Sequence, residues 1–275
     1  MTSVHASTEE DSYLWIEMNN AEKRNDGSLD LRLYLYFGKT SEQKEAPCEL
    51  RNLEAFYIKK GLGRPSSIKF CKAKIINSHN CCFIKINSPD ENSYTLYVSG
   101  VKENGQRRCH YFAKTTFALF GKSLNRNYDD IPADEKDINR QFEILTVPEF
   151  HYWPQTGSSL KISASFNGSP AAFNPIHIKD VHGPEIKIMP GKDGEVSYVP
   201  PEDAELNRKG STAFKNVIVT VRHYDAGDIY ISSRTLIFHR SRYGNYRIGT
   251  GGVIFCFSLA AFFISMYFIR KRSVS

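Results

Sequence analysis

The stretch Leu29–Gly38, LDLRLYLYFG, gives the clearest indication of the fold. Leucine occupies every second position from Leu29 to Leu35, with polar, charged or aromatic residues between. A period of two is typical of a β-strand with one buried face. Similar short runs, bounded by Gly, Pro, Asn or Ser, recur along the chain, and only the C-terminal segment departs from them. The sequence therefore predicts an all-β soluble part.

The expected strands fall into two groups. Before residue 121 they are, besides the first, AFYIKK (55–60), AKII (73–76), CCFIKI (81–86), YTLYVSG (94–100) and HYFAKTTFALFG (110–121). After residue 140 they are QFEILTVP (141–148), SLKISASF (159–166), PIHIKD (175–180), EIKIMP (185–190), EVSYVP (195–200), FKNVIVTVRHY (214–224) and YISSRTLIFHR (230–240). This spacing is typical of Greek-key sandwiches. The phrases FNGSP (166–170) and GKDGE (191–195) fit tight hairpin turns, in which Gly168 and Gly194 can adopt a positive φ.

A charged stretch rich in Asn and Asp separates the two groups and has the composition of an interdomain linker. We therefore expect two β-sandwich domains followed by one transmembrane α-helix. The expected boundaries are an N-terminal tail (1–11), a first β-sandwich domain (12–121), a linker (122–140), a second, Ig-like β-sandwich domain (141–240), a juxtamembrane segment (241–250), a transmembrane helix (251–269) and a basic tail (270–275).

The segment 251–269, GGVIFCFSLAAFFISMYFI, has 19 residues and no charge. At about 1.5 Å per residue, a helix of this length spans the ~30 Å hydrocarbon core of a bilayer. Tyr246 and Tyr267 lie near its two ends, where aromatic rings prefer the membrane interface. The sequence predicts a single-pass protein of the cell membrane, in contact with lipid. Small residues in the span favour packing against integral membrane subunits.

The orientation of this span is open on sequence grounds. Basic residues flank both of its ends, so the positive-inside rule does not decide. The first 20 residues are polar and lack the apolar stretch of a secretory signal peptide. Two interpretations remain: a tail-anchored cytosolic domain, or an exported domain whose leader is missing from the sequence as written.

Composition and motifs argue against several classes of function. The formal net charge is +6, but 36 basic residues are offset by 30 acidic ones, so we expect no nucleic-acid partner. The sequence contains no GxSxG, HExxH, P-loop or dinucleotide-binding motif, and we expect no enzyme. The six cysteines form no CxxC pair, and we expect most of these thiols to pack in the core, including one of Cys81 and Cys82. For an exported domain, the alternative is a disulfide among Cys48, Cys71, Cys81, Cys82 and Cys109.

Histidines offer the candidate metal ligands. His177 and His182 flank a turn in the phrase HIKDVH, and neutral imidazoles suit Ni, Co, Cu and Zn. The eight histidines are otherwise scattered, without an HxH or HxxxH pair. Solvated or hydrogen-bonded histidines on strand edges are the alternative interpretation for each of them.

Several phrases, taken in order, resemble a known family. They are SYLWIEM (12–18), LYLYFGK (33–39), YFAKT (111–115), FEILTVP (142–148), FNGSPAAFNPIHI (166–178), GKDGEVSYVPP (191–201) and VTVRHYDAGDIYISSRTLIF (219–238). Together they are similar to the exported β-rich accessory family associated with bacterial nickel and cobalt uptake, a domain of unknown function. Ser12 stands where that family has a histidine. Among the histidines of this chain, only His223 falls in a phrase where members of the family carry a polar residue or a histidine.

The resemblance implies two β-sandwich modules on the periplasmic or outer side, with the basic tail 270–275 in the cytoplasm. It also implies a link to transition-metal supply. The candidate ligands of a divalent Ni, Co or Cu ion are then His223, on the resemblance, and His177 and His182, on the turn phrase HIKDVH. The resulting hypothesis is a membrane-anchored accessory subunit of a membrane complex, linked to nickel or cobalt uptake or handling. The alternatives are a structural or adhesion subunit with Ig-like domains, and a tail-anchored adaptor without metal.

Overall fold

The structure is a computed structural model. It describes residues 12–18, 22–23, 29–39, 46–47, 49–60, 69–78, 81–87, 93–104, 107–118, 141–147, 157, 159–180, 185–200 and 214–239.

All regular secondary structure in these residues is β-strand, and the strands form three sheets. The first, called the N-sheet, contains β1 (Tyr13–Met18), β2 (Glu22–Lys23), β3 (Leu29–Gly38), β6 (Lys74–Ser78) and β7 (Cys81–Asn87). The second, the C-sheet, contains β10 (Phe142–Val147), β11 (Leu160–Phe166), β12 (Ser169–Pro170) and β15 (Glu195–Tyr198). The third, the central sheet, contains β4 (Arg51–Lys60), β5 (Lys69–Lys72), β8 (Ser93–Asn104), β9 (Arg107–Ala118), β13 (Ile176–Asp180), β14 (Glu185–Ile188), β16 (Phe214–Asp225) and β17 (Asp228–His239).

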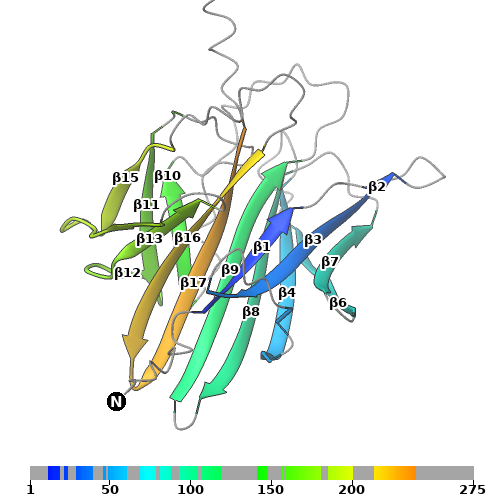
Figure 1. The fold of residues 1–275 in the computed structure, drawn as a ribbon, viewed down its shortest axis with the longest axis horizontal. Helices are drawn as coiled ribbons and strands as arrows, with labels where there is room; N and C mark the ends of the chain where they lie inside the picture. The colour runs from blue at the N-terminus through cyan, green and yellow to red at the C-terminus, as the bar shows by residue number, and fades with distance from the viewer. Residues whose placement is uncertain are drawn as a thin grey trace, which may run out of the picture. The chain divides into compact units, whose positions relative to one another are not determined.

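The central sheet joins the two halves of the chain. Its strand order is β14-β13-β16-β17-β9-β8-β4-β5, so β9 from the first half lies beside β17 from the second (Figure 1). These two strands pair in parallel, from Ile229 opposite Cys109 to Thr235 opposite Thr115. A parallel pair cannot be closed by a tight hairpin, and here more than a hundred residues separate the two strands. The rest of the central sheet is antiparallel.

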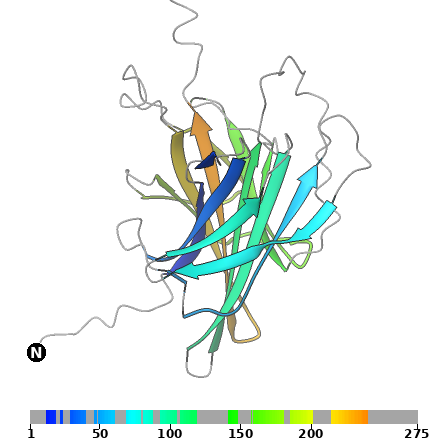
Figure 2. The same cartoon turned by 90° about the vertical axis from the view of Figure 1, so that its right-hand side faces the viewer.

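The N-sheet and the C-sheet cover opposite faces of the central sheet. Side chains alternate between the faces of a strand, and in β16 Ile218 packs into one core while Val217 and Val219 pack into another. β1 contacts β9 and β17 on the first face, and β10 contacts the same two strands on the second. Figure 2 shows the layers turned by 90°. Both faces of β9 and β17 are therefore covered.

The two cores differ in their makeup. The core under the N-sheet contains large rings, among them Trp15, Tyr111 and Phe117, with leucines of β3 such as Leu33. The core under the C-sheet is richer in β-branched residues, most of which come from β13 and β16, and it also contains Phe142 and Phe238. Burial of these apolar surfaces supplies the main favourable term in folding.

The strands expected from the sequence are present where the structure describes them. β3 spans Leu29–Gly38, as the alternation of leucines predicts. Gly168 and Gly194 have φ angles of 79° and 73° and occupy turns. The turn at Gly168 connects the paired strands β11 and β12, so this hairpin prediction is confirmed. The turn at Gly194 connects β14 to β15, which belong to different sheets, so the prediction of a hairpin there is wrong. The pattern did not single out β1, β2, β5 or β12 as strands. Within the described residues no helix is long and apolar enough to cross a bilayer, and the segment 251–269 lies outside those residues.

The two expected β-sandwich domains share a sheet, which the sequence did not indicate. The described residues up to His239 belong to one compact unit, and the expected domains 12–121 and 141–240 share the central sheet through β9 and β17. The pairing of two strands so far apart in the chain leaves no local sequence signal. The tail 1–11, the linker 122–140, the juxtamembrane segment 241–250 and the basic tail 270–275 lie outside the described residues.

Candidate functional site

The structure separates two of the three histidines that the sequence singled out. Ile176 of β13 pairs with Val221 of β16, and both side chains lie in the core under the C-sheet. His177 is one residue further along β13, so it faces the N-sheet side, whereas His223 lies on the same side as Val221. His182 lies outside the described residues. No group of three or more His, Cys, Asp or Glu side chains that could hold a metal ion occurs among the described residues.

His223 holds a turn in place. The amide Nδ2 of Asn174 lies 3.1 Å from Nδ1 of His223 and 3.4 Å from the carbonyl oxygen of Ala171. With Nδ2 as the donor, Nδ1 of His223 accepts, and the neutral ring has its proton on Nε2. The imidazole also packs against Phe166, with ring centroids 4.2 Å apart.

The turn held by Asn174 presents an exposed phenylalanine. Phe173 lies between β12 and β13, its side chain is 73% exposed, and its φ angle is 71°. A left-handed backbone is unusual for a bulky residue and costs about 1–3 kcal/mol. Nearby Ala171 donates its backbone N–H to the carbonyl oxygen of Ala164 at 2.8 Å, which ties the turn to β11. The turn is thus fixed on both sides while the ring of Phe173 faces solvent.

His177 lies in a second place, a pocket with a basic lining. Its Nδ1 is 2.5 Å from Oε1 of Glu185 across the β13–β14 pair. The pocket has a volume of about 270 Å³ and is also lined by Tyr13, Lys179 and Arg222. Imidazole and carboxylate are both metal-ligand types, but here they stand among cationic side chains.

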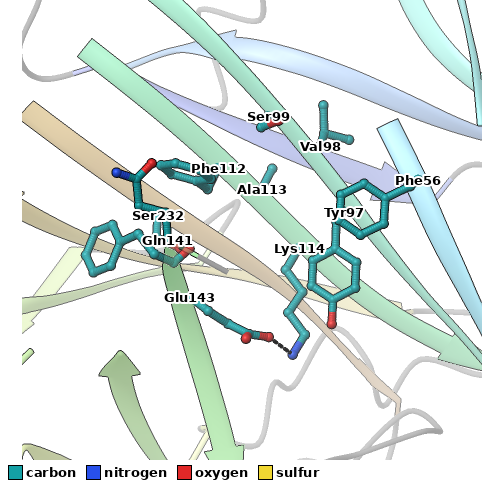
Figure 3. A pocket seen from close by; sticks show the side chains of 11 residues that line it. Phe56, Tyr97, Val98, Ser99, Phe112, Ala113, Lys114, Gln141, Glu143 and Ser232 are labelled. Carbon is teal, nitrogen blue, oxygen red and sulfur yellow. Dashed lines mark hydrogen bonds and ion pairs between the residues drawn. The ribbon is translucent and has the colours of Figure 1, made fainter. Parts of the chain in front are cut away.

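A third place is a cavity of about 210 Å³ between the edge of the C-sheet and the central sheet. Its lining is mainly apolar and includes the stacked rings of Phe56 and Tyr97, whose centroids are 5.2 Å apart. Figure 3 shows Lys114 of β9 and Glu143 of β10 pointing towards each other at this cavity. The Lys114 Nζ and Glu143 Oε1 atoms are 2.6 Å apart, and both side chains are buried. The Lys114 ammonium also lies 5.4 Å from the centroid of the Tyr97 ring.

Polar side chains of β17 donate hydrogen bonds to backbone carbonyl groups of both flanking sheets. On the C-sheet side, Arg234 donates from Nη1 to the carbonyl oxygen of Ile144 at 3.1 Å, and Ser232 donates to that of Phe142 at 3.5 Å. On the opposite face, Ser233 donates to the carbonyl oxygen of Leu14 in β1. A buried polar group must find a partner, so these contacts specify which strands lie over β17.

One further cluster lies where the β8–β9 hairpin meets the start of β17. Asp228 accepts hydrogen bonds from Arg108 at 2.9 Å and from Nε2 of His110 at 3.4 Å, and His110 stacks on Tyr230. Desolvation acts to raise the pKa of Asp228, but hydrogen bonds from Arg108 and His110, together with the charge of Arg108, bring the pKa below its usual range.

The cysteines described by the structure are thiols. Cys82 and Cys109 are buried in the core under the N-sheet and Cys71 is half-buried, which confirms core packing for two of the three. Cys48 and Cys256 lie outside the described residues, as does the side chain of Cys81.

Comparison with models of known protein families finds none that matches the chain, and a search of curated proteins also finds no match.

Sequence reasoning missed the Lys114–Glu143 pair and the Phe173 turn. Lys114 lies within the phrase YFAKT (111–115), which by itself indicates no chemical role for it. A signal exists in retrospect, because a lysine among apolar and hydroxyl residues of one long strand requires a buried anion or an exposed face. The partner Glu143 lies in the apolar phrase FEILTV, but nothing in the sequence says that these two strands pack together.

Proposed function

We propose that this chain is a membrane-anchored accessory subunit that acts by binding a partner protein in a membrane complex, without catalysing a reaction. The observation that carries the proposal is Phe173. Aromatic rings that are exposed and held rigidly are typical anchors of protein interfaces, because they bury a large area at little cost in conformational entropy. The contact between Asn174 and His223 holds the turn while the backbone of Phe173 keeps a strained, left-handed conformation. Strain of this kind clusters at functional sites, which supports a role for the Phe173 ring in binding.

The test is capture of the native complex. Wild-type chain and Phe173→Ser are expressed with the same affinity tag, extracted in mild detergent and compared on native gels. We expect the variant to lose most of the larger complex while keeping its own folded state. The control is Tyr224→Ser, which removes another exposed ring, from the face of β16 opposite His223. Full retention of the complex by Phe173→Ser would contradict the proposal.

The anchor in this proposal is the segment 251–269. Support comes from its uncharged length and from the chain connection, because β17 is fastened to both flanking sheets and leads through 240–250 to the apolar run. Alkaline carbonate extraction should leave the full chain in the membrane pellet and release a chain ending at residue 250. An unrelated run of 19 Leu and Ala residues in place of 251–269 should restore the pellet fraction. If it also restores the complex, the span contributes only anchoring.

The proposed orientation places residues 12–240 outside the cytoplasm. Asp225 is exposed in the β16–β17 turn, so Asp225→Cys offers a labelling site, whereas Cys82 and Cys109 are buried. A membrane-impermeant maleimide should label Asp225→Cys in intact cells more strongly than the wild type. Labelling only after lysis would favour the tail-anchored cytosolic adaptor.

The link to transition-metal handling is a second candidate, supported by the family resemblance and by the contact between His177 and Glu185. Elemental analysis of the purified full chain tests it. About one equivalent of nickel, cobalt or copper that is lost in His177→Gln and kept in His223→Gln would support a metal at His177. If no metal is bound after equilibration with each ion, the metal candidate is contradicted and the proposal of a metal-free accessory subunit is retained.

The Ig-like character of the second half is also part of the proposal. In support, β10, β11 and β15 lie over β13, β16 and β17 around one core, an arrangement of two packed antiparallel sheets within about 100 residues.

A further inference from the structure

The cavity at Lys114 and Glu143 lies where the central sheet extends beyond the edge of the C-sheet. β10 is the edge strand of the C-sheet, and it contacts β9 and β17 of the central sheet. β8 and β4 continue the central sheet past β9, and their residues line the cavity together with those of β10. The cavity therefore has walls from both sheets, within one compact unit.

The strand register explains why a hollow occurs at this point. Ser99 of β8 is paired with Phe112 of β9. Two residues earlier along β8, Tyr97 is paired with Phe56 of β4. Residues two apart share a face of the sheet, so these three rings flank one small side chain. All four residues line the cavity, with Ser99 as its floor and the rings as its walls.

The walls are accessible to a ligand. The side chains of Phe56, Phe112 and Ser99 are only half-buried, although they belong to long strands in the middle of the chain's largest sheet. Gln141, which also lines the cavity, is exposed. Tyr97 is 5% exposed and supports the Phe56 ring from behind, with 19° between the two ring planes. Aromatic walls of this kind favour an aromatic ligand, because rings gain from offset-stacked and edge-to-face contacts beyond the area that they bury.

One part of the lining is polar. Lys114 pairs with Glu143 at 2.6 Å, and its ammonium lies between that carboxylate and the Tyr97 ring (Figure 3). An ion pair in buried surroundings has a strong local dipole, which attracts a polar group on a ligand even while the pair stays intact. The pair has no net charge, and burying a charged ligand beside it would cost desolvation. A neutral hydroxyl is therefore favoured over a charged group.

We propose that this cavity binds a small neutral phenol, a molecule with one aromatic ring and a hydroxyl group. The ring lies over Ser99, between Phe112 and Phe56, and the hydroxyl is directed to the Lys114–Glu143 pair. The volume supports this size of ligand, since an apolar cavity of about 150 Å³ holds benzene, and this one has about 210 Å³. The inference does not depend on the proposed function, because the turn between β12 and β13 is not part of this lining.

The test uses the full chain in detergent micelles and fluorine NMR of two probes, 4-fluorophenol and fluorobenzene. Micelles without protein, at the same detergent concentration, give the partition of each probe into the detergent. Beyond that partition, we expect saturable binding of 4-fluorophenol to the wild type. Fluorobenzene should bind more weakly by roughly tenfold, because it lacks the hydroxyl group.

Ser99→Leu fills the floor of the cavity and should weaken the binding of 4-fluorophenol by roughly tenfold or more, because the probe ring and the leucine cannot occupy the same space. The matched control is Ser197→Leu, the same change at an exposed serine of β15 outside the lining. This control should bind 4-fluorophenol as the wild type does. Circular dichroism shows whether each variant is folded.

A second variant tests the polar part of the lining without filling the cavity. Lys114→Met combined with Glu143→Leu replaces the ion pair by apolar side chains of similar size, so it should bind the two probes with nearly equal affinity. The proposal is overturned if neither probe binds the wild type saturably, or if folded Ser99→Leu keeps wild-type affinity. It is also overturned if Ser197→Leu weakens binding as much as Ser99→Leu does, or if the double variant keeps the full preference for 4-fluorophenol.

Discussion

The two faces of the central sheet bury different kinds of side chain from the same pair of strands. On the N-sheet face, β9 and β17 present apolar residues and uncharged hydroxyls, such as Thr115, whose Oγ1 donates to the carbonyl oxygen of Thr235 at 3.2 Å. On the C-sheet face, the same strands bury the charged side chains of Lys114 and Arg234. One face is therefore neutral and rich in rings, and the other contains an ion pair.

This difference indicates that the two faces contribute differently to the fold. Apolar packing is nondirectional and supplies most of the free energy of folding. A buried ion pair adds little net stability, but it discriminates between alternative arrangements. Glu143 meets Lys114 in only one register of β10, since a slip of one residue would turn its carboxylate to the other face of the C-sheet. The neutral face thus stabilises the body, while the charged face selects the position of the C-sheet.

The largest expected effect is on the neutral face. Trp15→Ala empties the centre of the core under the N-sheet, where the indole is fully buried, and should lower the free energy of unfolding by about 3–5 kcal/mol. Urea denaturation followed by circular dichroism measures this. Phe83→Ala, at a half-buried ring of β7, is the control and should cost much less. Equal losses would show that the N-sheet core is not where the structure puts it.

On the charged face, Glu143→Ala should cost about 3 kcal/mol, because the Lys114 ammonium loses its carboxylate at 2.6 Å in a buried position. Replacing both residues by Lys114→Met with Glu143→Leu should recover most of the loss in the same denaturation assay. A double variant as unstable as Glu143→Ala would mean that the pair contributes net stability as well as selecting the register.

The pH dependence tests the edge of the neutral face. The native pKa of Tyr13 is about 12, above the usual 10.0, so its contribution to stability is complete below pH 10. That contribution is lost as the pH rises from 10 to 12, because the unfolded chain ionises first. The wild type should lose about 2–3 kcal/mol more than Tyr13→Phe over this window. Identical alkaline unfolding curves for the two proteins would contradict the burial of this hydroxyl.

The smallest effect concerns Asp228. Its native pKa lies below the usual value, so its contribution is present above the ordinary pKa of an aspartate and is lost as the pH falls through the native one. Acid unfolding of Asp228→Asn should therefore depend less on pH below about 4 than that of the wild type. A steeper acid transition in the variant would contradict the lowered pKa.

The sequence was sufficient for most of the longer strands, but not for how they assemble. The alternation at Leu29–Gly38 is a local property, and so are the turns at Gly168 and Gly194. The pairing of β9 with β17 depends on contacts between residues about 120 positions apart, which no local period encodes. The same reason explains the histidines. Their spacing could not show that a single step along β13, from Ile176 to His177, turns the imidazole away from His223.

The candidate sites could be anticipated even less. Phe173 is an ordinary residue in the sequence, and only its φ angle and exposure make it unusual. Ser99 is equally ordinary in the sequence, and only the rings of Phe56 and Phe112, brought near it from other strands, make it the floor of a cavity. Both features arise from tertiary packing.

The central claim is that residues of both halves form one body through the β9–β17 pair. The most direct test is to express residues 12–121 and 141–240 separately and together, and to record circular dichroism and gel filtration. The structure predicts that each half alone is unfolded or aggregated, because each would expose one side of the central sheet, and that coexpression yields one folded complex. Two halves that each fold cooperatively and remain separate when mixed would contradict the shared sheet.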